Sequence, residues 1–211
     1  TSFILSAHTE DGPYTVGANS IISSSPLPTG GMFVTTTNAA GEVIAFYRTD
    51  LTSPWHRLDL SAVAGAPRLL GDTVTGYAAQ EQTQYIAAAS SAGLILMRQG
   101  GNGSWTVRNL TTEIQGSEAI VTSMVVLQPQ SGYTIVGGLT AGGDLVIYGQ
   151  TASTNGQGQL VWGYDNLFNS VIRANSLPVP NFDVANRGRL IAYETSWDGL
   201  NIVGSGAGGQ P

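Results

Sequence analysis

One segment that recurs four times constrains this chain more than any other feature. The copies are Met32–Tyr47, Tyr85–Arg98, Tyr133–Tyr148 and Leu190–Val203. Each copy consists of an apolar strand, a short turn that ends in Gly and a second apolar strand. Successive copies begin about fifty residues apart, and a strand-built repeat of that length is typical of a β-propeller blade.

Two further strands complete the predicted repeat. After each of the first three hairpins comes a strand that opens on Trp, at Trp55–Leu60, Trp105–Leu110 and Trp162–Leu167. Another strand then leads into the next copy, at Thr73–Gln80 and Ala119–Leu127. Four strands per unit predict an all-β propeller of four-stranded blades, with four blades as the expected number. We expect one propeller domain over residues 1–205 and a Gly-rich C-terminal linker over 206–211.

The last copy lacks its Trp strand, whereas the N-terminus carries two surplus β-like segments, Phe3–His8 and Tyr14–Ile22. We expect these segments to complete the last blade and so remove exposed strand edges. The alternative is an arc of a larger propeller. The first strand of each hairpin is rich in small residues, which predicts the crowded innermost position of a blade. No segment shows the periodicity of an amphipathic helix.

Composition excludes several functions. The chain has no Cys, which removes disulfides and thiolate chemistry, and no Lys, which removes Schiff-base chemistry and a phosphate-binding P-loop lysine. The net charge is −6 and the Arg residues are scattered, which argues against nucleic-acid binding. No apolar run is long enough to span a membrane. Because the sequence starts at Thr1, we interpret it as a mature or excised part of an extracellular or cell-surface protein.

Two charged residues are candidates for a ligand site. Glu194 lies on the first strand of the last hairpin, where the other copies carry small residues such as Thr37 and Gly138. An acid at such a position is a candidate for binding, or for pairing with an Arg such as Arg48. Both interpretations stay open at this stage.

The turn Ser196-Trp197-Asp198-Gly199 is the only one of the four hairpin turns that contains an aromatic residue. An exposed indole beside a carboxylate can stack on a sugar ring while the carboxylate accepts hydrogen bonds from hydroxyls. The alternative is that Asp-Gly supplies a tight turn and Trp197 packs on a neighbouring blade. The other three Trp residues recur in register, and we expect them to pack between blades.

The residues point to no catalytic centre and no cofactor. Only two His residues are present, His8 and His56, and their spacing does not suit a metal site. There is no Gly-x-Ser-x-Gly motif. Propeller glycosidases bring their paired carboxylates together from separate blades, so sequence spacing does not test that class.

The order of apolar strand, Gly turn, Leu-Val-Ile-Tyr strand and Trp resembles bacterial β-propeller repeat modules, over most of residues 30–205. It is also similar to propeller lectins of the tectonin and fucose-binding kind. That resemblance implies carbohydrate binding between adjacent blades. It transfers only to Ser196-Trp197-Asp198-Gly199, because the corresponding turns of the other copies lack these residues.

These observations favour a non-enzymatic binding or scaffold module. The predicted ligand is a glycan or a cell-surface protein, bound through Trp197, Asp198, Glu194 and Arg48. One alternative is a structural repeat that self-associates through its termini within a larger surface protein or filament. Another alternative is a glycoside-cleaving propeller, which requires two acids that converge at the axial mouth.

Overall fold

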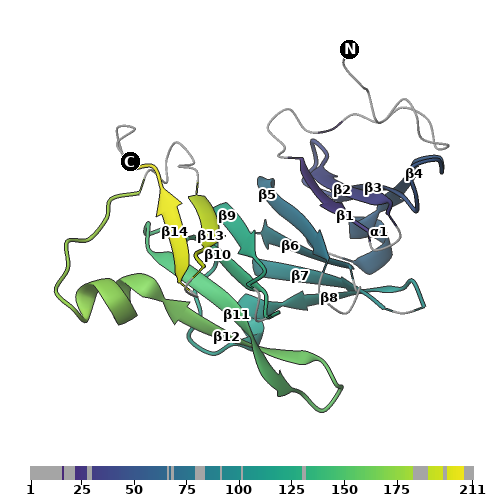
Figure 1. The fold of residues 1–211 in the computed structure, drawn as a ribbon. Helices are drawn as coiled ribbons and strands as arrows, with labels where there is room; N and C mark the ends of the chain where they lie inside the picture. Colours follow the sequence, from purple (N-terminus) through teal and green to yellow (C-terminus); the bar gives the residue numbers. More distant parts are fainter. Residues whose placement is uncertain are drawn as a thin grey trace. The chain divides into compact units, whose positions relative to one another are not determined.

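The computed structural model describes residues 16, 22–27, 30–65, 67, 69–78, 84–90, 92–100, 102–129, 132–182, 190–196 and 199–206 (Figure 1). Within these residues the fold is all-β, with four antiparallel sheets. Three sheets have four strands and one has two, and in the four-stranded sheets each strand pairs with its neighbours in chain order.

We name the sheets A to D in chain order. Sheet A contains β1 (Ser23–Pro26), β2 (Met32–Thr37), β3 (Val43–Arg48) and β4 (His56–Asp59). Sheet B contains β5 (Leu69–Ala78), β6 (Gln84–Ser90), β7 (Gly93–Gln99) and β8 (Trp105–Asn109). Sheet C contains β9 (Thr122–Leu127), β10 (Ile135–Leu139), β11 (Leu145–Thr154) and β12 (Leu160–Asn166). Hairpin D contains β13 (Leu190–Glu194) and β14 (Leu200–Gly204).

All four predicted hairpins are confirmed, as β2–β3, β6–β7, β10–β11 and β13–β14. The turns of β2–β3 and β10–β11 have the same backbone hydrogen bonds. In sheet C, the Thr140 N–H donates to the Asp144 carbonyl at 3.0 Å, and the Gly143 N–H donates to the Thr140 carbonyl at 3.0 Å. Gly143 has φ of 85°, a left-handed conformation that favours glycine. This geometry explains why the predicted turns end in Gly.

The prediction that the first hairpin strand is innermost is wrong. Strands β2, β6 and β10 lie inside their sheets, with a partner strand on each side. The small residues of these strands instead allow neighbouring segments to pack closely against the faces of the sheets. A Cβ placed on Gly137 would lie 3.3 Å from Ile202 of hairpin D, and one on Gly138 would lie 2.4 Å from Ile120.

The structure also contains helices that the periodicity did not predict. Short helices follow the last strand of each four-stranded sheet: α1 (Leu60–Ala64), α2 (Leu110–Glu113) and the π-helix η2 (Phe168–Arg173). They were missed because each is a single turn or little more, too short to show an apolar stripe. The sequence signal is instead a repeated cap, in which Trp is followed four residues later by Asp or Asn and then Leu: Asp59-Leu60, Asn109-Leu110 and Asn166-Leu167.

The two predicted N-terminal strands lie mostly outside the described residues. Phe3–His8 lies outside the described residues. In Tyr14–Ile22 the described residues Val16 and Ile22 belong to no strand. Among the described residues the first strand is β1, whose residues Ser23-Ser-Ser-Pro26 have low β-propensity. Its place at the edge of sheet A accounts for the proline, because an edge strand tolerates a missing N–H donor.

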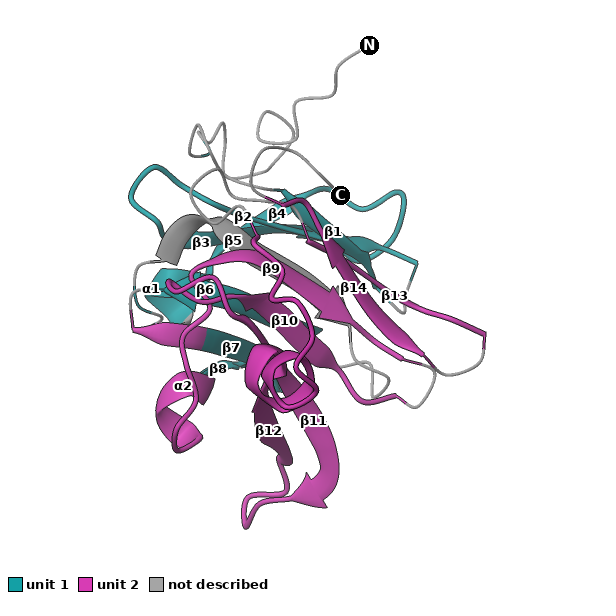
Figure 2. Cartoon of the chain, turned by 90° about the vertical axis from the view of Figure 1, so that its left-hand side faces the viewer, with its two compact units in different colours: residues 1–91, 95–108 teal, residues 92–94, 109–211 magenta. Residues whose placement is uncertain are grey.

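The chain divides into two compact units (Figure 2). The first comprises residues 1–91 and 95–108, and the second comprises 92–94 and 109–211. In the first unit, sheets A and B share one core, which includes Phe33, Val43, Ile86, Met97 and Trp105. In the second unit, sheet C and hairpin D share another core around Leu139, Leu145, Phe168 and Leu190. Trp55, directly before β4, Trp105, the first residue of β8, and Trp162 in β12 are buried. As predicted for packing between blades, Trp105 contacts Phe33 of the neighbouring sheet A, whereas Trp55 packs within its own sheet.

Candidate functional site

The residues predicted to bind a ligand occupy different parts of the chain. Glu194 is the last residue of β13 in the second unit, half-buried and opposite Leu200 of β14. Trp197 and Asp198 lie outside the described residues. Arg48 ends β3 in the first unit. Glu194 therefore lies next to the predicted turn in the sequence, and Arg48 belongs to the other unit.

Arg48 is held within its own sheet. Its guanidinium carbon lies 4.9 Å from the ring centroid of Trp55, and its Nη1 donates a hydrogen bond to the Leu51 carbonyl at 3.1 Å. A cation over an indole face that also binds a backbone carbonyl stabilises the turn between β3 and β4. These contacts indicate a structural role for Arg48.

Thr195 links the two described ends of the turn next to Glu194. The Thr195 N–H donates to the Gly199 carbonyl at 2.9 Å, and the Gly199 N–H donates to Thr195 Oγ1 at 3.1 Å. Thr140 uses the same side-chain bond in sheet C, where its Oγ1 accepts from the Asp144 N–H at 3.2 Å. A Ser or Thr side chain that accepts from the backbone in this way is a common means of fixing a turn.

A group of interacting polar side chains in sheet C was not predicted from the sequence. It centres on Asn166, which lies just before η2 and is only 7% exposed. The Asn166 Oδ1 accepts from the Asn169 N–H at 3.1 Å, while its Nδ2 donates to Glu118 Oε2 at 2.8 Å and to Asp144 Oδ2 at 2.9 Å. One amide therefore joins a helix start, a hairpin turn and the segment before β9.

Two further residues complete this group, which we call the Asn166 network. The Arg173 guanidinium binds both carboxylate oxygens of Asp144 at 3.1 Å, and the Tyr164 hydroxyl donates to Glu118 Oε2 at 2.9 Å. The hydrogen bond from Arg173 holds the pKa of Asp144 below its ordinary value. Desolvation and the neighbouring Glu118 carboxylate raise the pKa of the Tyr164 hydroxyl.

The Asn166 network serves structure better than catalysis. It contains two carboxylates, but Asp144 is ionised at neutral pH and already carries a bidentate arginine. Both oxygens of Asp144 bind Arg173, and Oδ2 also accepts from Asn166, so this carboxylate holds the turn before β11 against β12 and η2. We assign the network to the stabilisation of sheet C.

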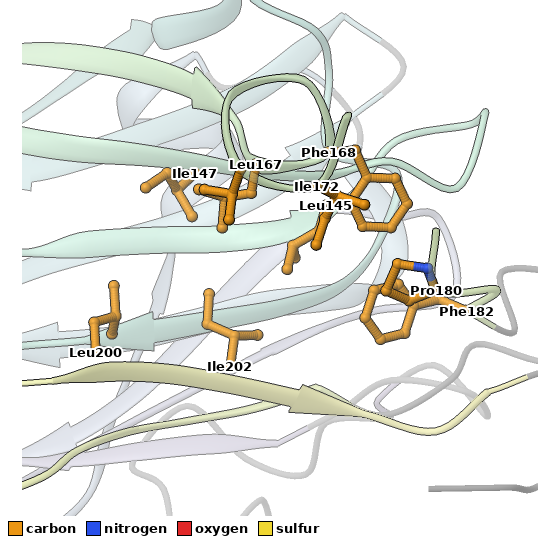
Figure 3. Close-up of a pocket in the computed structure, with 10 residues that line it drawn as sticks. Leu145, Ile147, Leu167, Phe168, Ile172, Pro180, Phe182, Leu200 and Ile202 are labelled. Atoms are coloured by element: carbon orange, nitrogen blue, oxygen red, sulfur yellow. The ribbon is translucent and has the colours of Figure 1, made fainter. Parts of the chain in front are cut away.

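A pocket of about 370 Å³ lies in the second unit, against the core of sheet C and hairpin D (Figure 3). Side chains from β11, from the connection between β12 and β13, and from β14 point into it. The lining residues are all apolar: Leu145, Ile147, Leu167, Phe168, Val171, Ile172, Pro180, Phe182, Leu200 and Ile202. Phe168 and Phe182 stack at one end, with their ring centroids 5.9 Å apart.

Residues that line this pocket are more exposed than the residues at the same positions of other copies of the repeat. The positions of Leu145 and Leu200 correspond to Val43 and Leu94, which are fully buried, whereas Leu200 is 38% exposed. Leu60 and Leu110 are also fully buried, but the corresponding Leu167 is only half-buried. These apolar positions are thus fully buried in the first two copies of the repeat and more exposed to solvent around the pocket.

One wall of the pocket is formed by the connection that follows β12. Its described part, residues 167–182, supplies η2 and the segment that ends at Phe182. The connections after β4 and β8 begin with the short α-helices α1 and α2, whereas this one begins with a π-helix. π-Helical turns often occur at functional sites.

Comparisons with known proteins assign no family to this chain: no protein-family model matches it, and a search of curated proteins found no match. In the part of the chain that the structure describes, no helix is long and apolar enough to cross a membrane. The described residues also contain no group of three or more His, Cys, Asp or Glu side chains placed to hold a metal ion.

Proposed function

We propose that this chain is a non-enzymatic binding or scaffold module, built as a β-propeller of four blades. The observation that carries the binding function is the contrast between the repeated frame and its third connection. Across the frame, Asp59, Asn109 and Asn166 each cap the turn of helix that follows a sheet. The connection after β12 begins with the π-helix η2 where the others begin with α1 and α2, and its described residues form a wall of the pocket.

The four-blade proposal is supported by the topology of sheets A to C and by the core that each unit forms between consecutive sheets. In this proposal, Phe3–His8 supplies a further strand to hairpin D, beside β14. The chain contains no Cys, so a single pair of introduced cysteines tests this pairing directly.

We would replace Leu5 and Asn201 by Cys and oxidise the protein. An intramolecular disulfide supports closure within one chain. A disulfide between chains supports self-association through the termini instead, and the absence of any disulfide at equilibrium contradicts strand addition at this place.

A glycan is the ligand class we propose for the end of hairpin D. Glu194 ends β13, three residues before Trp197 in the sequence, and a carboxylate together with an indole suits a sugar ring and its hydroxyls. We place such a module outside the cell or at its surface.

The test is a broad glycan array, run with calcium and with chelator, on the full chain and on Trp197→Ala and Glu194→Gln. Ser196→Ala, in the same turn, is the matched control. Selective binding that is lost in the first two variants and kept in the control supports the glycan site. Binding that survives Trp197→Ala, with the fold intact by circular dichroism, contradicts that site.

A structural repeat module is the second candidate, and one observation favours it. On the face of hairpin D away from the core, Ile191, Tyr193 and Val203 are 64%, 46% and 47% exposed. Exposed apolar strand faces promote association. Sedimentation over a range of protein concentrations tests this candidate: a concentration-dependent increase in mass that Val203→Glu abolishes supports it, and a monomer at all concentrations contradicts it.

A further inference from the structure

We propose that the pocket between sheet C and hairpin D binds an uncharged, apolar small molecule or group, such as a ring system or a branched hydrocarbon. This inference rests on the proposed binding function and names a ligand class for it. A volume of about 370 Å³ accommodates roughly a dozen heavy atoms at the volume per water-sized group found in liquids.

The chemistry of the lining sets the ligand class. Every side chain that lines the pocket is a hydrocarbon, from Leu145 on β11 to Ile202 on β14. A sugar hydroxyl placed among these side chains would lose hydrogen bonds to water and find no side-chain partner. An apolar molecule loses no hydrogen bonds on entry, and it removes the exposed surface of Val171 and Leu200 from water.

The core of the first unit, between sheets A and B, contains large buried side chains. Phe33 and Trp105 lie there with ring centroids 6.0 Å apart, and Met97 is fully buried. Folded proteins leave few voids larger than a water molecule in such cores. A pocket of about 370 Å³ against the core of sheet C and hairpin D is therefore a departure from ordinary core packing.

The shape of the pocket favours a small molecule over a peptide segment. Phe168, Pro180 and Phe182 gather at one end, while Leu200 lies at the other (Figure 3). A docking helix or strand buries a row of side chains along a groove, typically at several successive turns or alternate positions. A volume within the lower range of small-molecule sites suits one compact occupant.

The probe for the test is N-phenyl-1-naphthylamine, an uncharged aromatic amine whose fluorescence rises in apolar surroundings. We expect saturable binding to the full chain with one site per monomer. Ile202→Phe places a larger side chain in the pocket and should weaken binding at least tenfold. Val203→Phe adds the same ring one residue along β14, on the opposite face of the strand, and should change affinity less than twofold.

Ile147→Phe fills the pocket from the opposite wall, on β11, and provides a second variant if Ile202→Phe fails to fold. Equal loss of binding in the Val203 control, or unchanged binding in both pocket variants, overturns the proposal. No saturable binding to the wild-type chain also overturns it. Binding that disappears at protein concentrations where the chain self-associates assigns the pocket to a second copy and likewise overturns it.

The same protein preparations would be applied to the glycan array. Glycan binding without probe binding refutes only the apolar pocket and leaves the binding module in place. Probe binding without glycan binding supports the pocket and contradicts the sugar site at the end of hairpin D. Failure of both, with a monomeric chain, refutes the proposed binding function itself.

Discussion

The Asn166 network makes the sharpest prediction about stability, through the substitution Asn166→Ala. This side chain is buried and makes three hydrogen bonds: it accepts from the Asn169 N–H and donates to the carboxylates of Glu118 and Asp144. Alanine removes all three bonds and leaves two carboxylates without a shared donor. The helix start, the turn before β11 and the segment before β9 lose their common link.

The expected loss of unfolding free energy is estimated from the individual hydrogen bonds. Loss of an Asn cap destabilises by about 1 kcal/mol. Hydrogen bonds to charged groups contribute about 1.5 kcal/mol at the low end, which applies here because Glu118 is exposed and Asp144 keeps its arginine. The unfolding free energy should therefore fall by about 2.5 kcal/mol, since the contacts share one side chain and do not add fully. For a domain of this size the melting temperature should fall by roughly 5–10 °C.

Urea unfolding, followed by tryptophan fluorescence, measures this loss. Asn175→Ala is the matched control, because Asn175 is exposed and only its Nδ2 bond to the Val171 carbonyl is lost. The control should change stability by less than about 0.5 kcal/mol. If Asn166→Ala is no more destabilising than the control, the Asn166 network does not hold these segments together.

A second substitution, Asn166→Asp, separates the cap from the donor. Aspartate still accepts from the Asn169 N–H, but it brings a third carboxylate against Glu118 and Asp144. Repulsion raises the pKa of the new carboxyl above its unfolded value, so the stability deficit is full at neutral pH and shrinks as the pH falls through that folded value. A deficit that stays the same from pH 7 to pH 4 would refute the reasoning.

Two other predictions concern sheet C. Gly138→Ala should destabilise by about 1–3 kcal/mol in urea unfolding, because the added Cβ would lie 2.4 Å from the buried Ile120, while Gly142→Ala, with no contact closer than 3.7 Å, should be nearly neutral. Asp144 has a lowered pKa, so its contribution is present above its ordinary value of 3.8 and is lost as the pH falls through the lower folded value. Arg173→Gln removes the largest cause, and the urea midpoint should then depend less steeply on pH between 4 and 2; an unchanged slope would contradict this assignment.

The repeat made much of the fold predictable from sequence. Alternating apolar residues and Gly-ended turns located every hairpin, and the Trp residues located β4, β8 and β12. Strand β1 escaped prediction because Ser23-Ser-Ser-Pro26 takes its conformation from pairing with β2 rather than from propensity. The helices escaped because single turns depend on a cap, such as Asn109 accepting from the Thr112 N–H, and not on periodicity.

The candidate sites were less predictable, since they depend on contacts between distant segments. Glu118 and Asp144 are far apart in sequence and meet only through Asn166. The pocket joins residues of β11, η2 and β14, each of which has an ordinary apolar place in its own repeat. A sequence pattern reports which residues face a core, but it does not report whether the core is filled.

One position differs in chemistry between copies of the repeat: the residue after the leucine that follows the Asp or Asn cap. In the first two copies this position holds a hydroxyl that fixes the preceding hairpin: Ser61 Oγ accepts from the Val43 N–H at 2.8 Å, and Thr111 Oγ1 accepts from the Leu94 N–H at 2.9 Å. In the third copy it holds Phe168, which has no hydroxyl and lines the pocket instead.

The third hairpin takes its support from other groups, since Asp144 at its turn binds Asn166 and Arg173. Because these side chains hold the third hairpin, position 168 needs no hydroxyl to accept from the hairpin backbone. It can therefore hold the aromatic side chain of Phe168, which lines the pocket. The Asn166 network and the pocket are therefore two consequences of one departure from the repeat. Damage to the network should accordingly loosen the pocket, whereas substitutions at Ser61 should affect only the stability of sheet A.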